Sequence, residues 1–93
     1  MLQTYDDFLK ASLNDPGFAR AYHELDLPSQ ISNQIISLRG ARGLTQHMLA
    51  EKINTTQSSI ARLESMNSLP SLSFLQRIAE ALGAKLEIRF TIE

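Results

Sequence analysis

The polar run from Thr56 to Arg62 is the part of this sequence best suited to contacting a ligand. It reads Thr-Gln-Ser-Ser-Ile-Ala-Arg, and no acidic residue follows until Glu64. If Thr56 caps a helix here, Gln57, Ser58 and Arg62 lie on its outer face. That face can approach phosphates without charge repulsion, and its amide, hydroxyl and guanidinium groups can hydrogen-bond base edges. The residue types therefore indicate a nucleic-acid-binding helix.

A second short helix has to hold this one at a steep angle across a tight turn. Thr45 is suited to cap it, and Ala50 supplies the small side chain that a close helix contact needs. Asn54 lies at the turn, where a residue that tolerates left-handed backbone angles is required. The inward positions of the two helices are all aliphatic: Leu49, Ile53, Ile60 and Leu63. The spacing predicts a helix-turn-helix from roughly Thr45 to Glu64.

Further helices and one strand are expected around this motif. Asp15 and Pro16 predict a helix start, and Leu27-Pro28-Ser29 predicts its end. A helix is expected from Ser29 to near Gly43, and another from Ser71 until Gly83 stops it. In the last ten residues apolar and polar side chains alternate, which predicts a strand whose buried face carries Leu86, Ile88, Phe90 and Ile92.

We therefore predict an all-α fold in three parts. Residues 1–28 form an N-terminal helical extension, residues 29–83 the helix-turn-helix domain, and residues 84–93 a short C-terminal β-strand. One strand cannot satisfy its own backbone groups, so we expect it to pair with the same strand of a second copy. The strand residues Leu86, Ile88, Phe90 and Ile92 are thus expected to form a homodimer contact.

The net charge of −1 hides an uneven distribution. Residues 1–28 carry two basic against five acidic side chains, a net −3, whereas residues 29–67 carry four against two, a net +2. Phosphate attraction depends on the local patch, so the basic middle suits DNA. At 93 residues, 43% of them hydrophobic, the chain can form one domain with a modest core. No signal-peptide or membrane-helix pattern is evident, so we expect a cytoplasmic protein.

Nothing in the sequence suggests catalysis, a metal or a cofactor. There is no cysteine, which excludes disulfides and thiolate metal sites. His23 and His47 are isolated from carboxylates at metal-binding spacing. Ser58 and Ser59 have no histidine at a spacing that would activate a hydroxyl. We expect a binding protein that is not an enzyme.

Several segments, in the right order, resemble the lambdoid-repressor (XRE) helix-turn-helix family. The resemblance covers residues 29–83 and includes Arg42-Gly43-Leu44-Thr45-Gln46, Thr56 to Glu64, and Ile78 to Gly83. Asn54 departs from the glycine usual at the turn. The resemblance implies that Gln46 binds a phosphate and that Arg39 and Glu64 form a partly buried salt bridge between helices. The full set of DNA-binding residues that it and the motif suggest is Gln46, Thr56, Gln57, Ser58, Ser59, Arg62, Arg42, Thr45, Asn67 and Ser68.

The ends of the chain are similar to host-inhibition-of-growth (HigA-like) type II antitoxins. That similarity implies a repressor of its own operon which also neutralises a small basic ribonuclease toxin. The acidic arm suits such a partner, with Phe8, Phe18 and Tyr22 as apolar anchors. The alternative is a stand-alone phage-type or chromosomal regulator without a toxin. An enzyme with this motif as an accessory domain, as in cyanase, would need a catalytic region beyond residue 83, where ten residues remain.

Overall fold

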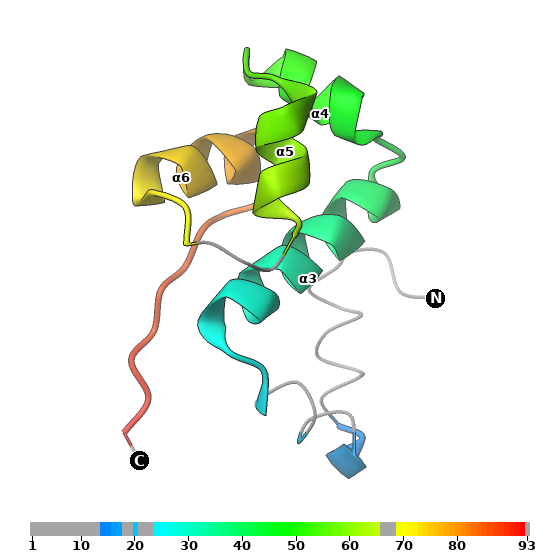
Figure 1. The fold of residues 1–93 in the computed structure, drawn as a ribbon. Coiled ribbons are helices and arrows are strands. Elements are labelled where there is room, and N and C mark those ends of the chain that lie inside the picture. Colours follow the sequence, from blue (N-terminus) through cyan, green and yellow to red (C-terminus); the bar gives the residue numbers. More distant parts are fainter. Residues whose placement is uncertain (1–13, 18–19, 21–23, 66–68, 93) are drawn as a thin grey trace.

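The computed structural model describes residues 14–17, 20, 24–65 and 69–92. In this part of the chain four α-helices are bounded: α3 (Leu27–Ala41), α4 (Gln46–Lys52), α5 (Gln57–Leu63) and α6 (Leu72–Ala81). Figure 1 shows the two short helices α4 and α5 above the longer α3, with α6 to one side of α5. The predicted all-α class is confirmed for the residues described.

The first helix of the domain starts two residues earlier than predicted. Helix α3 begins at Leu27, because Asp26 caps it by accepting a hydrogen bond from the Ser29 backbone N–H at 2.8 Å. Pro28 lies in the first turn, where the missing backbone N–H would have had no helical partner. Our interpretation of Pro28 as a helix end was therefore wrong.

The predicted caps and turn of the helix-turn-helix are confirmed. The hydroxyl of Thr45 accepts from the Met48 backbone N–H at 3.0 Å, and that of Thr56 accepts from the Ser59 N–H at 3.1 Å. Asn54 has a φ of 56°, the left-handed conformation that the turn needs. These local signals fix where α4 ends and α5 begins.

The core lies where α3, α4, α5 and α6 meet. Leu49 and Ile60 are fully buried, and each such side chain stabilises the fold by about 1.5–3 kcal/mol. Ala50 is 1% exposed, as a close contact between α4 and α5 requires. Leu72 was expected in the apolar stripe of α6 but is exposed, because it is the first residue of that helix. The buried hydrophobic residues are Ile35, Leu49, Ala50, Ile53, Ile60, Leu63, Leu75, Ile78 and Leu82.

Only part of the expected N-terminal extension is described. Residues 16, 17, 20 and 24 are helical, and the Asp15 carboxylate accepts from the Gly17 N–H at 2.8 Å. Asp15 therefore caps this helix with Pro16 in its first position, as predicted. The expected toxin contacts Phe8, Phe18 and Tyr22 lie outside the described residues.

The predicted C-terminal strand is wrong within a single copy. Residues 84–92 form neither helix nor strand, and Figure 1 shows them leading away from α6. A strand exists only beside another strand, and the described part of this chain contains none. Leu86 packs against the core, but Ile88, Phe90 and Ile92 are 61%, 94% and 98% exposed. The apolar face that we expected to be buried is thus left uncovered.

Candidate nucleic-acid interface

Helix α5 presents two chemically different faces. Ile60 and Leu63 are 0% and 3% exposed and hold the helix on the core. Gln57, Ser58 and Arg62 are exposed, as is Ala61 between them. The face available to a ligand therefore carries an amide, a hydroxyl, a methyl and a guanidinium group. It carries no acid, because Glu64 lies beyond the end of the helix and is 8% exposed.

Two of the expected DNA-binding hydroxyls are engaged at the start of α5. Besides capping the helix, Thr56 Oγ1 lies 2.9 Å from Ser59 Oγ, so the two hydroxyl groups share a hydrogen bond. Ser59 is half-buried, whereas Ser58 is exposed. Ser58 is therefore the hydroxyl of this helix best placed to reach a base or phosphate. Arg62 borders a shallow hollow of about 190 Å³ that Pro70 and Phe74 also line.

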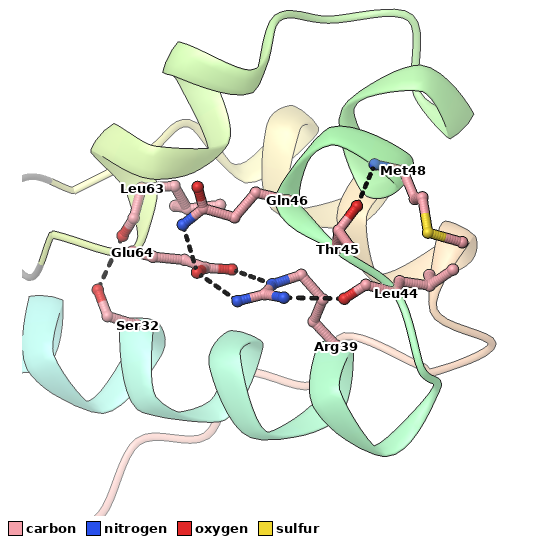
Figure 2. Close-up of polar contacts among 8 residues, drawn as sticks. All are labelled: Ser32, Arg39, Leu44, Thr45, Gln46, Met48, Leu63 and Glu64. Atoms are coloured by element: carbon pink, nitrogen blue, oxygen red, sulfur yellow. Dashed lines mark hydrogen bonds and ion pairs between the residues drawn. The ribbon is translucent and has the colours of Figure 1, made fainter.

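The carboxylate of Glu64 joins three helices through hydrogen bonds (Figure 2). Arg39 of α3 approaches it as a two-pronged fork, with Nε donating to Oε2 at 2.7 Å and Nη2 donating to Oε1 at 2.9 Å. The remaining Arg39 nitrogen, Nη1, donates to the backbone carbonyl of Leu44 at 2.8 Å. The expected ion pair is thus present, and it ties the end of α5 to α3. A bidentate fork of this kind is the strongest geometry for such a pair.

Gln46 is the third group on this carboxylate. Its Nε2 donates to Glu64 Oε1 at 3.0 Å, and the residue is half-buried at the first position of α4. The amide nitrogen carries two hydrogens, so one N–H remains for a second acceptor. The phosphate contact predicted for Gln46 would use that N–H, with Glu64 fixing the orientation of the amide.

The same carboxylate affects the charge state of Arg39. The hydrogen bonds that Arg39 donates to the Glu64 carboxylate raise the pKa of the guanidinium above its ordinary value, and burial opposes this effect. Arg39 is therefore charged at every accessible pH. All three of its nitrogens have protein partners, which favours a structural role for Arg39 over a contact with DNA.

Two other arginines bond to carbonyl groups at helix ends. Arg42 Nε donates to the Leu82 carbonyl at 2.8 Å, so this residue, predicted to bind phosphate, also caps the end of α6. Arg77 donates to the carbonyl of Ile53 at the end of α4 and lies over the Phe74 ring, 5.9 Å from its centroid. Sequence reasoning did not predict either carbonyl contact.

Sequence reasoning also missed Ser32. It is 1% exposed, and its hydroxyl donates to the Leu63 carbonyl at 2.8 Å, next to Glu64 in the chain. Asn67 and Ser68, two expected phosphate contacts, lie outside the described residues. The structure thus brings Gln46, Arg39 and Glu64 together and leaves Gln57, Ser58 and Arg62 on a separate exposed face.

The described residues show neither a metal site nor a membrane span. They contain no group of three or more histidine, cysteine, aspartate or glutamate side chains that could hold a metal ion. No helix among the residues described is long and apolar enough to span a membrane.

The fold and the exposed face of α5 define a helix-turn-helix domain, the class to which many DNA-binding regulators belong. A helix-turn-helix family model matches residues 35–88, more than half of the chain. The chain belongs to the XRE-type helix-turn-helix family.

Three relatives illustrate the range of the similarity. Antitoxin HigA1 of Mycobacterium tuberculosis is 31% identical over 74 residues, which cover 80% of this chain and 50% of the relative. The immunity repressor protein of Bacillus phage phi105 is 41% identical over 56 residues, covering 60% of this chain and 39% of the relative. The HTH-type transcriptional regulator YgzD of Bacillus subtilis is 30% identical over 63 residues, covering 68% of this chain and 96% of the relative.

The chain spans half or less of the length of most of the curated relatives that it matches. What those longer proteins do as a whole therefore reaches this chain only as a proposal. No solved structure gave a significant match.

Proposed function

We propose that this protein is a transcriptional repressor that reads an operator through the exposed face of α5. The observation that carries the proposal is that face, where Gln57, Ser58 and Arg62 stand free of acidic neighbours on a helix anchored by buried residues. Glutamine can bond adenine through two hydrogen bonds, and arginine can do the same with guanine. Serine discriminates weakly between bases and is suited to a phosphate or an accessory base contact.

In this proposal α4 provides the phosphate contact. Gln46 offers its second amide N–H beside the start of the helix, and Glu64 holds the amide in place. Phosphate contacts set the orientation of the protein on the duplex, whereas base contacts set the sequence. Thr45, Thr56, Ser59, Arg42, Asn67 and Ser68 complete the proposed set of flanking contacts.

The repressor is proposed to act as a homodimer on a palindromic operator. The exposed apolar side chains of Ile88, Phe90 and Ile92 support a contact between copies. A two-fold pair would place two α5 helices about one DNA turn apart, the spacing of half-sites for this kind of motif.

Binding titrations on an operator duplex and a scrambled duplex test the reading role of α5. Arg62→Ala should weaken specific binding by about 1–3 kcal/mol and relax preference at one base position. Gln46→Ala should weaken binding to both duplexes alike. Gln76 is an exposed glutamine on α6, so Gln76→Ala is the matched control and should change the affinity for neither duplex. Unchanged affinity in the Arg62 and Gln46 variants would reject the assignment.

A more specific proposal is that the protein is the antitoxin of a type II toxin–antitoxin pair. Its supports are the similarity to antitoxin HigA1 over 80% of this chain and the net −3 charge of residues 1–28. An acidic arm beside a basic DNA-binding segment is suited to a basic protein partner. Phe8, Phe18 and Tyr22 are the proposed apolar anchors to that partner, a small basic ribonuclease.

Co-expression with the product of the adjacent open reading frame tests the antitoxin proposal. The two proteins should form a complex, and reversing the charges of Asp6, Asp7 and Glu24 should weaken it in a salt-dependent way. Operator binding should survive that change. If the neighbouring product neither binds nor harms cells, the stand-alone regulator is correct. The similarities to the phage immunity repressor and to YgzD favour that second function.

A further inference from the structure

Residues 84–92 have the sequence pattern of a strand without a partner. The segment is anchored at its start, where Ala84 N–H donates to the Ala79 carbonyl at 2.8 Å and Leu86 packs on the core. Beyond that point Ile88, Phe90 and Ile92 are exposed. Glu87 and Arg89 lie on one side of the backbone, since their charged groups approach to 4.0 Å. Side chains two residues apart meet in this way on an extended chain.

The sequence restricts how two copies of this segment can pair. In an antiparallel pair with two-fold symmetry, residues directly opposite one another point to the same face. The apolar side chains must therefore face apolar ones, which requires the symmetry axis to pass through a residue and excludes axes between residues. The choice among the remaining registers then depends on which charged side chains become neighbours.

A pair centred on Ile88 is the register that both forms opposite-charge pairs and gives every residue from Ala84 to Ile92 a neighbour. It sets Glu87 of each copy opposite Arg89 of the partner subunit, giving two opposite-charge pairs. On the apolar face it sets Ile88 against its own equivalent and Leu86 against Phe90 of the partner subunit. Every residue from Ala84 to Ile92 gains a neighbour in this register.

The other registers are less favourable. A centre at Arg89 or at Glu87 sets that residue against its own equivalent and so pairs like charges, which destabilises a strand pair. A centre at Phe90 sets Arg89 opposite Thr91 and gains no ion pair. A centre at Leu86 matches Lys85 with Glu87, but it leaves Phe90 and Ile92 without a neighbouring strand.

From these observations we infer that two copies of the protein pair through residues 84–92 as an antiparallel two-stranded ribbon centred on Ile88, with Glu87 and Arg89 selecting the register. The ribbon covers the exposed apolar side chains by laying them together over the helices on which Leu86 already packs. This inference rests on the proposed homodimer and adds to it the pairing and the residues that determine it.

Charge exchange tests the register in the full-length protein. Glu87→Arg alone and Arg89→Glu alone each create two like-charge pairs and should weaken dimerisation at least about tenfold. The double variant Glu87→Arg, Arg89→Glu should dimerise like the parent. A mixture of the two single variants should form heterodimers, because each then meets its opposite charges. Lys85→Glu is the control: it faces Thr91 in this register and should leave the dimer unchanged. Light scattering and sedimentation measure all of these.

Cysteine cross-linking locates the symmetry axis directly, because the native chain has no cysteine. With the axis at Ile88 the two Ile88 Cα atoms are about 4.5–5.5 Å apart, within the range that a disulfide spans. Ile88→Cys should therefore form a disulfide-linked dimer under mild oxidation. Phe90→Cys should not, since its two copies are about 13 Å apart along the ribbon.

The outcomes separate the register from the dimer itself. A parent protein that is monomeric at high concentration overturns both. Two results would overturn the register but not the dimer. One is disulfide cross-linking through Phe90→Cys or Leu86→Cys. The other is a dimer affinity that the single charge changes at Glu87 and Arg89 leave unchanged. The base contacts of α5 are measured separately, by the titrations of the Arg62 and Gln46 variants.

Discussion

Replacing Glu64 by alanine should destabilise this protein strongly. The Glu64 side chain is 5% exposed and accepts three hydrogen bonds, two from Arg39 and one from Gln46. Without it, the Arg39 guanidinium, whose side chain is 18% exposed in the native protein, keeps its charge and its bond to Leu44 but loses two hydrogen-bond acceptors. The cost is therefore that of a partly buried, unpaired cation.

The magnitude follows from that geometry. Removing one partner of a fully buried pair costs about 3–5 kcal/mol. Because the guanidinium of Arg39 reaches solvent and retains one protein acceptor, we expect about 2–3 kcal/mol for Glu64→Ala, somewhat below that range. In a domain of this size each kcal/mol lowers the melting temperature by about 4–8 °C, so the expected fall is about 10–20 °C.

Thermal denaturation followed by circular dichroism measures this effect. Glu80→Ala is the matched control, because Glu80 is an exposed acid on α6 and its loss should change stability by no more than about 0.5 kcal/mol. Replacing Arg39 and Glu64 together by methionine should recover much of the loss, since no unpaired charge is left behind. A Glu64→Ala protein that melts like the Glu80→Ala control would refute the reasoning.

Substitutions at three further positions, Asn54, Thr56 and Asp26, test the caps and the turn. Asn54→Ala should cost about 1 kcal/mol in urea denaturation because alanine is strained at a φ of 56°, whereas Asn54→Gly should be neutral or stabilising. Thr56→Ala should lose about 1 kcal/mol of stability by the same measurement, since it removes the cap of α5. The pKa of Asp26 is held below its ordinary value of 3.8 mainly by the backbone N–H of Ser29, so its charge stabilises the fold above that pH. This contribution should vanish as the pH falls through the lowered pKa, and Asp26→Asn should remove that part of the acid sensitivity in a titration followed by circular dichroism.

The local signals of the sequence were sufficient to place the helix-turn-helix. Thr45 and Thr56 were predicted as caps because a side-chain oxygen before an apolar periodic run satisfies a free N–H nearby. Asn54 was predicted at the turn for a comparable reason. These interactions span three residues or fewer, so the sequence around each one contains all the groups involved.

Contacts between distant residues were not predictable in the same way. Ser32 bonds a carbonyl 31 residues away, and Arg42 bonds one 40 residues away. Any backbone carbonyl can accept such a bond, so the sequence has no feature that marks the partner. The bridge between Arg39 and Glu64 was expected only through the family resemblance. The strand at residues 84–93 was wrong for a single copy, because alternation shows which side chains share a face and not whether another strand is present.

The pairing of Arg39 with Glu64 affects how operator binding should respond to salt. Glu64 cancels the charge of Arg39, which leaves Arg42, Lys52 and Arg62 as the exposed basic residues of segment 29–67 that can displace counterions from DNA. Each neutralised phosphate contributes about −0.9 to the slope of log affinity against log salt concentration. A fourfold rise in salt should then weaken binding to each half-site about 40-fold, not the roughly 150-fold that four free basic residues would give. The affinity of the protein for its operator would therefore fall less steeply as the ionic strength rises.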